Sequence, residues 1–189
     1  QNNITTSKAF FTDVNGFKLY NGGVRMYQTM TTKTIENTTK ETRMFDDTNC
    51  IGTRTIPANF LQAGMTIGIR VRNELSNVGN PTNTMKIYLG STEIYNNSAT
   101  LGAVHTNDFA EIHLEITIRS VGATGTLVAM GRTLILGNSD VSRKIIVSTP
   151  ITIDTTVENK IEIFYTWGTA NASNILKTVI AEIDIYNNK

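Results

Sequence analysis

The chain has 189 residues and a formal net charge of +1, with 40% hydrophobic and 17% charged residues. This length suits a single domain, and a near-neutral chain lacks the basic stripe that phosphate backbones require, so no nucleic-acid partner is expected. No apolar run approaches the roughly eighteen residues of a membrane helix, so no membrane insertion is expected.

Threonine and asparagine together make up roughly a quarter of the chain, well above their usual share. The branched Cβ of threonine favours strands, whereas asparagine favours turns and left-handed backbone. Few stretches have helical periodicity. The composition therefore predicts an all-β protein with many short strands joined by polar turns.

The N-terminal part divides into three segments. Residues 1–16 are mostly polar and are interpreted as an arm or linker; since the chain begins at glutamine rather than methionine, we expect it to be processed or trimmed. Residues 17–20 and 24–30 are predicted strands around an Asn-Gly-Gly turn. Residues 31–45 consist largely of Thr, Lys and Glu, a composition that fits disorder and an exposed strand equally well.

The middle of the chain carries the clearest strand pattern. Residues 109–119 alternate strictly, with Ala110, Ile112, Leu114, Ile116 and Ile118 on one face. Further strands are predicted at residues 65–72, 84–89, 92–95, 125–136, 143–149 and 151–156.

The C-terminal segment has two alternating runs around a turn rich in Gly, Ala, Asn and Ser, which predicts a β-hairpin or a longer strand–loop–strand unit. In the first run the predicted inward residues are Ile161, Ile163, Tyr165 and Trp167. In the second run they are Ile175, Val179, Ala181, Ile183 and Ile185, with Lys177 interrupting that face.

About eight to ten strands with regular turn spacing are typical of a sandwich or barrel. We predict an antiparallel β-sandwich of jelly-roll type, with residues 17–189 as a single domain. An immunoglobulin-like sandwich is shorter and usually has a Cys…Trp…Cys core, and this chain has one cysteine.

The side chains that could take part in catalysis or metal binding form no recognisable motif. Glu111, His113 and Glu115 share one strand face but spread along roughly 13 Å, too far apart to converge on zinc, so a solvated strand face is expected. His105 is predicted to lie in a loop, and Cys50 to be buried or incidental. No catalytic residue, metal or cofactor is therefore predicted. Trp167, the single tryptophan, is interpreted as packing in the core or an interface, with sugar stacking as the less favoured alternative.

Four segments together carry a resemblance to known proteins: residues 34–42, 52–64, 121–126 and the Trp-Gly-Thr-Ala run that begins at Trp167. They resemble phage and large-virus structural proteins of the kind that form fibre, spike or tail-tip head domains. The similarity covers residues 31–186 and favours a strand over disorder at residues 31–45. The chain departs from the pattern in the charge of its last strand (Lys177, Glu182, Asp184) and in residues 1–30.

The resemblance implies a non-enzymatic, trimeric jelly-roll head in the virion, extracellular when it functions, that binds a host-surface receptor such as a glycan or protein. The N-terminal arm would contact other virion proteins. Tyr165 and Trp167 would then belong to the core or the trimer interface. Candidate receptor contacts are Tyr88, Tyr95, Asn96 and Asn97.

Three alternatives remain open at this point. A monomeric carbohydrate-binding module would share the fold and differ in oligomeric state. A capsid decoration protein would bind no ligand. A glycan-cleaving enzyme would release soluble products and depend on one acidic residue.

Overall fold

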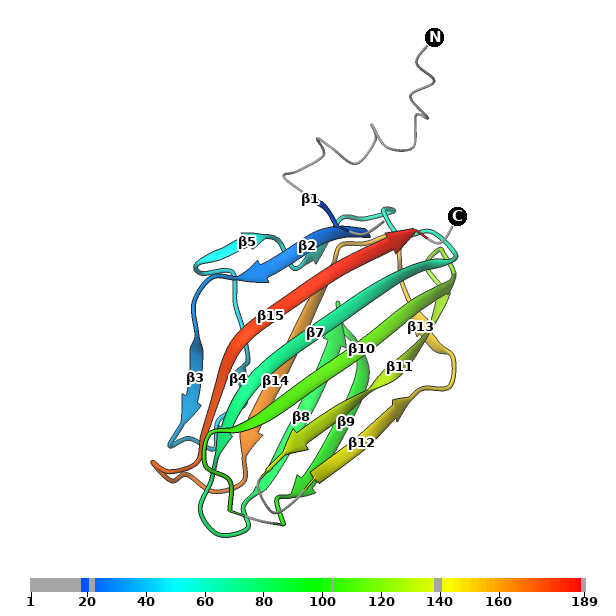
Figure 1. Cartoon of the computed structure of the whole chain (residues 1–189). Helices are drawn as coiled ribbons and strands as arrows, with labels where there is room; N and C mark the ends of the chain where they lie inside the picture. Colours follow the sequence, from blue (N-terminus) through cyan, green and yellow to red (C-terminus); the bar gives the residue numbers. More distant parts are fainter. Residues whose placement is uncertain (1–17, 21–22, 103, 138–140, 188–189) are drawn as a thin grey trace.

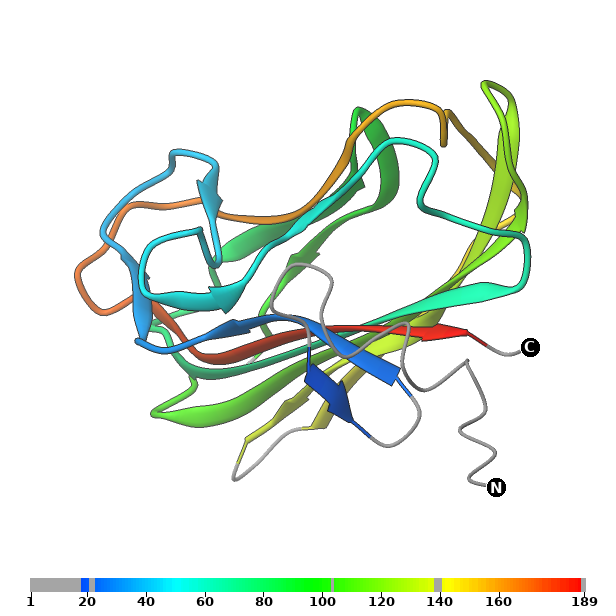
Figure 2. The same cartoon turned by 90° about the horizontal axis from the view of Figure 1, so that it is seen from above.

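The computed structural model describes residues 18–20, 23–102, 104–137 and 141–187. Residues 1–16, interpreted as an arm, lie outside this part of the chain. Every strand pairing within it is antiparallel, and the strands form two sheets that face each other as layers (Figures 1 and 2). In these residues no helix has the length and apolarity of a membrane span.

The larger sheet has ten strands, and its main path runs in the following order: β1 (Lys18–Tyr20), β2 (Gly23–Thr29), β15 (Ile175–Asn187), β7 (Met65–Ser76), β10 (Asp108–Ser120), β11 (Gly125–Leu136) and β12 (Val141–Val147). Three short strands join it from the side: β13 (Ile151–Ile153) pairs with β11, β3 (Lys33–Glu36) with β15, and β5 (Cys50–Gly52) with β2.

The smaller sheet has five strands: β4 (Thr42–Arg43), β14 (Asn159–Trp167), β8 (Thr82–Leu89) and β9 (Thr92–Thr100) in order, with β6 (Thr55–Ile56) paired to β14. The chain crosses repeatedly between the sheets, and the result is an antiparallel sandwich of jelly-roll type, as predicted. The strand number was underestimated. The described residues form fifteen strands, of which nine have at least seven residues and six have only two to four, too short to show an alternating pattern.

Two long central strands confirm the predicted alternation. On β10 the five predicted apolar residues are buried, and on β7 the same holds for Met65, Ile67, Ile69 and Val71. The two strands pair directly, with Ile112 opposite Val71 and Ile116 opposite Ile67. Their inner faces form the centre of the core.

The two C-terminal strands do not pair with each other, so a hairpin is excluded and the longer strand–loop–strand unit is present. β14 pairs with β8 in the smaller sheet, and β15 pairs with β7 in the larger one. The connecting residues 168–174 are long enough to cross the ~10 Å between packed sheets. Each strand buries its apolar face against the opposite layer.

The inward face of β15 differs from the predicted one in its first half. A register shift between Thr178 and Ile180 leaves Val179 39% exposed. A β-bulge of this kind places an extra residue in the strand and reverses the alternation. Leu176 and Thr178 are therefore buried before the bulge, and Ile175 and Val179 are not, whereas Ala181, Ile183 and Ile185 face inward as predicted.

Residues 31–45 contribute one short strand to each sheet, β3 to the larger and β4 to the smaller. Their apolar residues Ile35, Met44 and Phe45 are buried. The strand interpretation thus holds for two short stretches, Lys33–Glu36 and Thr42–Arg43.

A buried arginine anchors the following segment to β14. Arg54 is 1% exposed, and its Nε and Nη2 donate to the two carboxylate oxygens of Asp47 at 2.8 and 2.9 Å. Its guanidinium lies over the ring of Phe45, 5.7 Å from the centroid. Lys160 of β14 also donates to Asp47, at 2.7 Å. Such a bidentate, charge-assisted pair fixes geometry more firmly than a single surface ion pair.

This arrangement predicts a loss of stability in acid. Hydrogen bonds from Arg54, and then from Lys160, hold the pKa of the Asp47 carboxyl well below its usual value. The ionised carboxylate therefore stabilises the fold above about pH 4, the unfolded-state pKa, and this contribution is lost as the pH falls toward the folded-state pKa. The urea concentration at the unfolding midpoint, measured between pH 2 and 7, should decrease as the pH drops below about 4. Asp47→Asn should make this decrease smaller.

The matched control is Asp154→Asn, because the Asp154 carboxylate accepts from its neighbour Thr156 rather than from a cation. It should leave the acid decline as in the wild type. An Asp47→Asn protein with the wild-type pH dependence would contradict the prediction.

Candidate functional site

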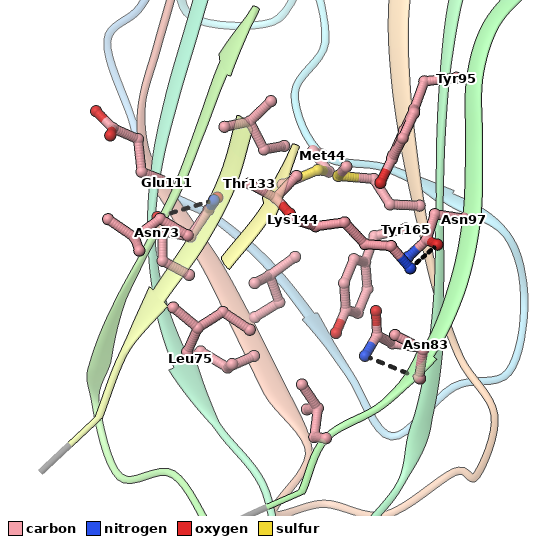
Figure 3. A pocket seen from close by; sticks show the side chains of 18 of the residues that line it. Met44, Asn73, Leu75, Asn83, Tyr95, Asn97, Glu111, Thr133, Lys144 and Tyr165 are labelled. Carbon is pink, nitrogen blue, oxygen red and sulfur yellow. Dashed lines mark hydrogen bonds between the residues drawn. The ribbon is translucent and has the colours of Figure 1, made fainter. Parts of the chain in front are cut away.

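A cavity of about 100 Å³ lies between the two sheets, beside the edge strands β9 and β12 (Figure 3). One water molecule requires roughly 10–15 Å³ on this measure, so the space admits a group larger than a single water. The cavity is lined by β7, β10, β11, β12 and β15 of the larger sheet and by β8, β9 and β14 of the smaller.

Small inward residues create this space. Ala99 on β9, Ala110 on β10 and Thr133 on β11 line the cavity, whereas Leu114 and Ile116 occupy inward positions farther along β10 and fill the core. Small side chains at these neighbouring inward positions leave space that larger aliphatic residues would fill. The strand alternation therefore places the cavity at this end of the sandwich.

A hydrogen bond joins the two sheets at the cavity. Lys144 of β12 extends toward the smaller sheet, and its Nζ donates to Asn97 Oδ1 of β9 at 2.5 Å (Figure 3). Thr133 is the direct neighbour of Lys144 in the β11–β12 pair and lines the same wall. This contact brings an ammonium group and an amide together.

Two tyrosines add hydroxyl groups from the smaller sheet. The Tyr95 Oη atom is buried and has no hydrogen-bond partner among the described residues, and Figure 3 shows it directed into the cavity. Tyr165 on β14 also lines the space. Burial raises the pKa of both hydroxyls, so both remain protonated donors at neutral pH.

Two asparagines complete the polar lining. Asn83 of β8 donates through Nδ2 to the Ala99 carbonyl at 3.3 Å. Asn73 of β7 donates to the Ala110 carbonyl at 3.3 Å and accepts from Thr178 Oγ1 at 2.9 Å. These hydrogen bonds hold the two asparagine side chains in place at the cavity wall. Most of the remaining wall is apolar and includes Met44, Leu75, Met85, Ile112, Ile135 and Leu176.

The four candidate receptor contacts do not form one site. Tyr95 and Asn97 line the cavity, whereas Tyr88 and Asn96 lie on the opposite face of the smaller sheet. The cause is a register shift between Ile87 and Tyr88, which leaves Ile94 as an extra residue and turns both Ile94 and Tyr95 inward. Simple alternation across 92–97 fails at this bulge.

On the outer face, Tyr88 and Asn96 share one acceptor. Both the Tyr88 hydroxyl and Asn96 Nδ2 donate to Glu93 Oε2, at 3.1 and 3.2 Å. The Tyr88 ring meets the Phe164 ring edge to face, with centroids 5.9 Å apart. These side chains satisfy one another along the sheet surface and contribute nothing to the cavity.

The structure places Tyr165 and Trp167 on the inner face of β14, in the core. Trp167 is fully buried, and Tyr165 is 7% exposed. Their rings meet edge to face with centroids 5.1 Å apart. Tyr165 therefore packs in the core and lines the cavity.

Sequence reasoning missed Lys144 as a functional residue. In the run Val141-Ser-Arg-Lys-Ile-Ile-Val147, two adjacent isoleucines leave the inward phase ambiguous. The structure resolves it: Ile146 is 2% exposed, whereas Ile145 and Val147 are 54% and 67% exposed, so Lys144 faces inward with Ile146. The signal was a lysine at one of two alternative inward positions.

Within the described residues, no group of three or more His, Cys, Asp or Glu side chains is arranged to hold a metal ion. Glu111 is engaged by Arg132 at 3.3 Å, on the face where His113 is half-buried. Burial raises the pKa of the free Cys50 thiol, which disfavours the reactive thiolate.

His105 lies in a loop, as predicted, but it is buried. Its Nδ1 lies 2.8 Å from Asp108 Oδ2, and its backbone exchanges hydrogen bonds with Asn77, whose backbone N–H donates to the His105 carbonyl and whose Oδ1 accepts from the His105 N–H. These bonds join the β7–β8 and β9–β10 connections at the cavity end of the sandwich. The histidine therefore positions two loops.

No protein-family model matches the chain, and a search of curated proteins finds no similar sequence. Three solved structures align with most of this chain at low similarity. A legume lectin-like domain from Entamoeba histolytica has 6% identity and a TM-score of 0.28, over 93% of this chain and 88% of that one.

The CBM2 module of the evolved Dit of Lactobacillus casei BL23 phage J-1 has 10% identity and a TM-score of 0.33, over 94% and 82% of the two chains. The κ-carrageenase of Pseudoalteromonas carrageenovora has 7% identity and a TM-score of 0.26, over 90% and 82%. At these values the likeness assigns neither a family nor a function.

Proposed function

We propose that this protein is a non-catalytic carbohydrate-binding β-sandwich, and that it serves as the head domain of a virion fibre, spike or tail tip that attaches to a host-surface glycan. The observation that carries the proposal is the cavity between the sheets, where a lysine, two tyrosine hydroxyls and asparagine side chains converge on an apolar wall. Concave sites with few, well-placed polar groups are typical of small-ligand binding.

The chemistry of the wall suits a sugar. A pyranose has C–H faces that pack on apolar and aromatic surface and a rim of hydroxyls that both donate and accept hydrogen bonds. Tyr95 and Tyr165 offer hydroxyls and ring surface, Asn97 offers an amide, and Lys144 offers further donors. No acidic pair is needed for binding, and the proposal assigns none.

The attachment part of the proposal rests on the resemblance at residues 34–42 and 52–64 and on the jelly-roll fold. In a virion the protein would act outside the cell, with residues 1–16 connecting it to other virion proteins. Several heads that each bind weakly would engage one cell surface with far higher avidity. A monomeric binding module and a ligand-free decoration protein are the competing functions.

The glycan proposal is tested by screening immobilised saccharides and then titrating the best ligand against Tyr95→Phe. The Tyr95 hydroxyl has no protein partner among the described residues, so its removal should leave stability unchanged and weaken binding about five- to tenfold, the value of one hydrogen bond. The matched control is Tyr88→Phe, on the outer face, which should bind as the wild type does.

Three results would contradict this reading. Loss of binding in Tyr88→Phe alone would place the ligand on the outer face. Soluble products from a bound oligosaccharide would indicate an enzyme. Failure to bind any saccharide would favour a decoration protein.

We further propose that the protein forms a homotrimer. Large apolar side chains are exposed on the outer face of β11 and β12: Met130, Ile145 and Val147 are 60%, 54% and 67% exposed. β12 is also the terminal strand of the larger sheet's main path, with backbone groups on one side available for pairing. An exposed apolar patch of this kind is typical of a protein–protein interface.

Light scattering coupled to gel filtration should therefore give three times the chain mass of 20.8 kDa. Ile145→Glu should shift the protein toward monomer, because the interface would have to bury a carboxylate. Val157→Glu should not, because Val157 is 50% exposed in the loop between β13 and β14, away from β12. A wild-type monomer at all concentrations would favour the lone binding module.

A further inference from the structure

We propose that the cavity selects saccharides that carry a carboxylate, such as a uronic or a sialic acid, and that Lys144 recognises this group. The inference rests on the proposed carbohydrate-binding function and names the class of sugar for the same site. It follows from the charge of the wall, the free donors of Lys144 and the second donor supplied by Tyr95.

The only charge directed into the cavity by its lining residues is positive. Among these residues Lys144 and Glu111 are the charged ones. Figure 3 shows the Glu111 carboxylate pointing away from the space. On the outer face of the sheet it accepts from Arg132 Nη2 at 3.3 Å and lies 4.0 Å from Arg72 Nε. Its charge is thus compensated elsewhere, and the charge left at the cavity is that of Lys144, a solvent-exposed side chain that reaches Asn97 at the cavity wall.

Lys144 has donors left for a ligand. Its one hydrogen bond among the described residues goes to Asn97 Oδ1, a neutral acceptor, whereas Lys33, Lys86 and Lys160 donate to the carboxylates of Asp46, Glu41 and Asp47. An ammonium group has three N–H donors, so two remain. The bond to Asn97 holds the amine across the gap between β12 and β9 before any ligand arrives, which reduces the entropy lost on binding.

Tyr95 supplies a second donor from the opposite sheet. Its buried Oη is directed into the cavity and remains protonated, so it donates to an anionic oxygen. Met85, Ile135 and Leu176 make the surrounding wall apolar. In such surroundings a charge-assisted hydrogen bond is stronger than in water. A carboxylate between Lys144 and Tyr95 would gain both donors, whereas a neutral hydroxymethyl group would gain less.

The test compares saccharides that carry a free carboxylate with related saccharides that do not. Trigalacturonic acid and its methyl ester share one sugar skeleton, and sialyllactose and lactose extend the comparison to the second source of carboxylate. Titration calorimetry with the full chain should show the acid at least about tenfold tighter than its ester, a difference that decreases from 0.05 to 0.5 M NaCl. Sialyllactose binding in place of trigalacturonate would assign the carboxylate to sialic acid.

Two variants, each replacing a cationic side chain by glutamine, locate the effect. Lys144→Gln should bring acid and ester to equal affinity. Arg143→Gln removes the adjacent cation of the same strand, which lies on the outer face opposite Leu134, and should keep the preference. Circular dichroism confirms that each variant is folded.

Equal wild-type affinity for acid and neutral ligands would overturn the acidic selectivity and leave carbohydrate binding intact. Loss of the preference in Arg143→Gln, or its retention in Lys144→Gln, would assign recognition to another surface and also overturn the inference. Absence of binding to all four saccharides would overturn the proposed function together with it.

Discussion

Trp167→Ala is expected to lower the free energy of unfolding by about 3–5 kcal/mol, the usual loss when a large aromatic side chain is removed from a core. Trp167 is fully buried and is the largest of the fully buried side chains. Domains of this size are stable by roughly 5–15 kcal/mol, so the variant would lose a large part of its stability.

Three contributions add up at this position. The substitution removes the buried apolar surface of the indole and leaves a cavity. It removes the edge-to-face contact with Tyr165 at 5.1 Å. It also removes the hydrogen bond from Trp167 Nε1 to the Ile35 carbonyl at 3.2 Å, which links β14 of the smaller sheet to β3 of the larger. The tryptophan therefore holds the two layers together at this end.

Urea unfolding is to be followed by far-ultraviolet circular dichroism, because Trp167 is the only tryptophan and its fluorescence disappears with it. Trp167→Phe, which keeps an aromatic ring and loses the indole N–H, should fall between the wild type and the alanine variant. A Trp167→Ala protein within 1 kcal/mol of the wild type would show that the indole does not pack as described.

The features that were predictable from the sequence are those that depend on local alternation against one continuous apolar surface. β10 is the clearest case, since its five inward residues are all aliphatic and its outward residues are mostly polar or charged. A one-residue slip would expose the whole row, so the phase is strongly determined. The same holds for β7 and for the inward row of β14.

The features that were not predictable depend on long-range pairing and on bulges. Nothing in the runs at 161–167 and 175–185 indicates that they join different sheets, because both place apolar residues on one face in either arrangement. The bulges at Val179 and Ile94 reverse the alternation without a distinctive residue. The second bulge explains why half of the candidate contacts lie in the cavity and half on the other face.

Lys144 shows why the candidate site could not be predicted from the sequence. A lysine on an edge strand is usually solvated, and only the register with Thr133 places it on the inner face. Its partner Asn97 is forty-seven positions away in sequence. A site assembled across two sheets is therefore set by tertiary packing rather than by a local motif.

Gly52→Ala is expected to lower the free energy of unfolding by about 2–5 kcal/mol, for two separable reasons. The residue has φ of +77°, where a side chain costs roughly 1–2 kcal/mol. A Cβ there would also lie 2.0 Å from the Met26 carbonyl oxygen. Relieving that overlap requires β5 to separate from β2, at a further cost of about 1–3 kcal/mol.

Gly64→Ala separates the two effects. Gly64 also has positive φ, +91°, but a Cβ there meets no atom within 4 Å, so the variant should lose only the conformational part. The Met26 carbonyl cannot move aside freely, because it accepts the Thr53 N–H at 2.8 Å and belongs to a buried residue. The urea midpoints of Gly52→Ala and Gly64→Ala should therefore differ clearly from each other. If they coincide, β5 can shift on β2 without loss, and the close approach of the two strands does not require glycine.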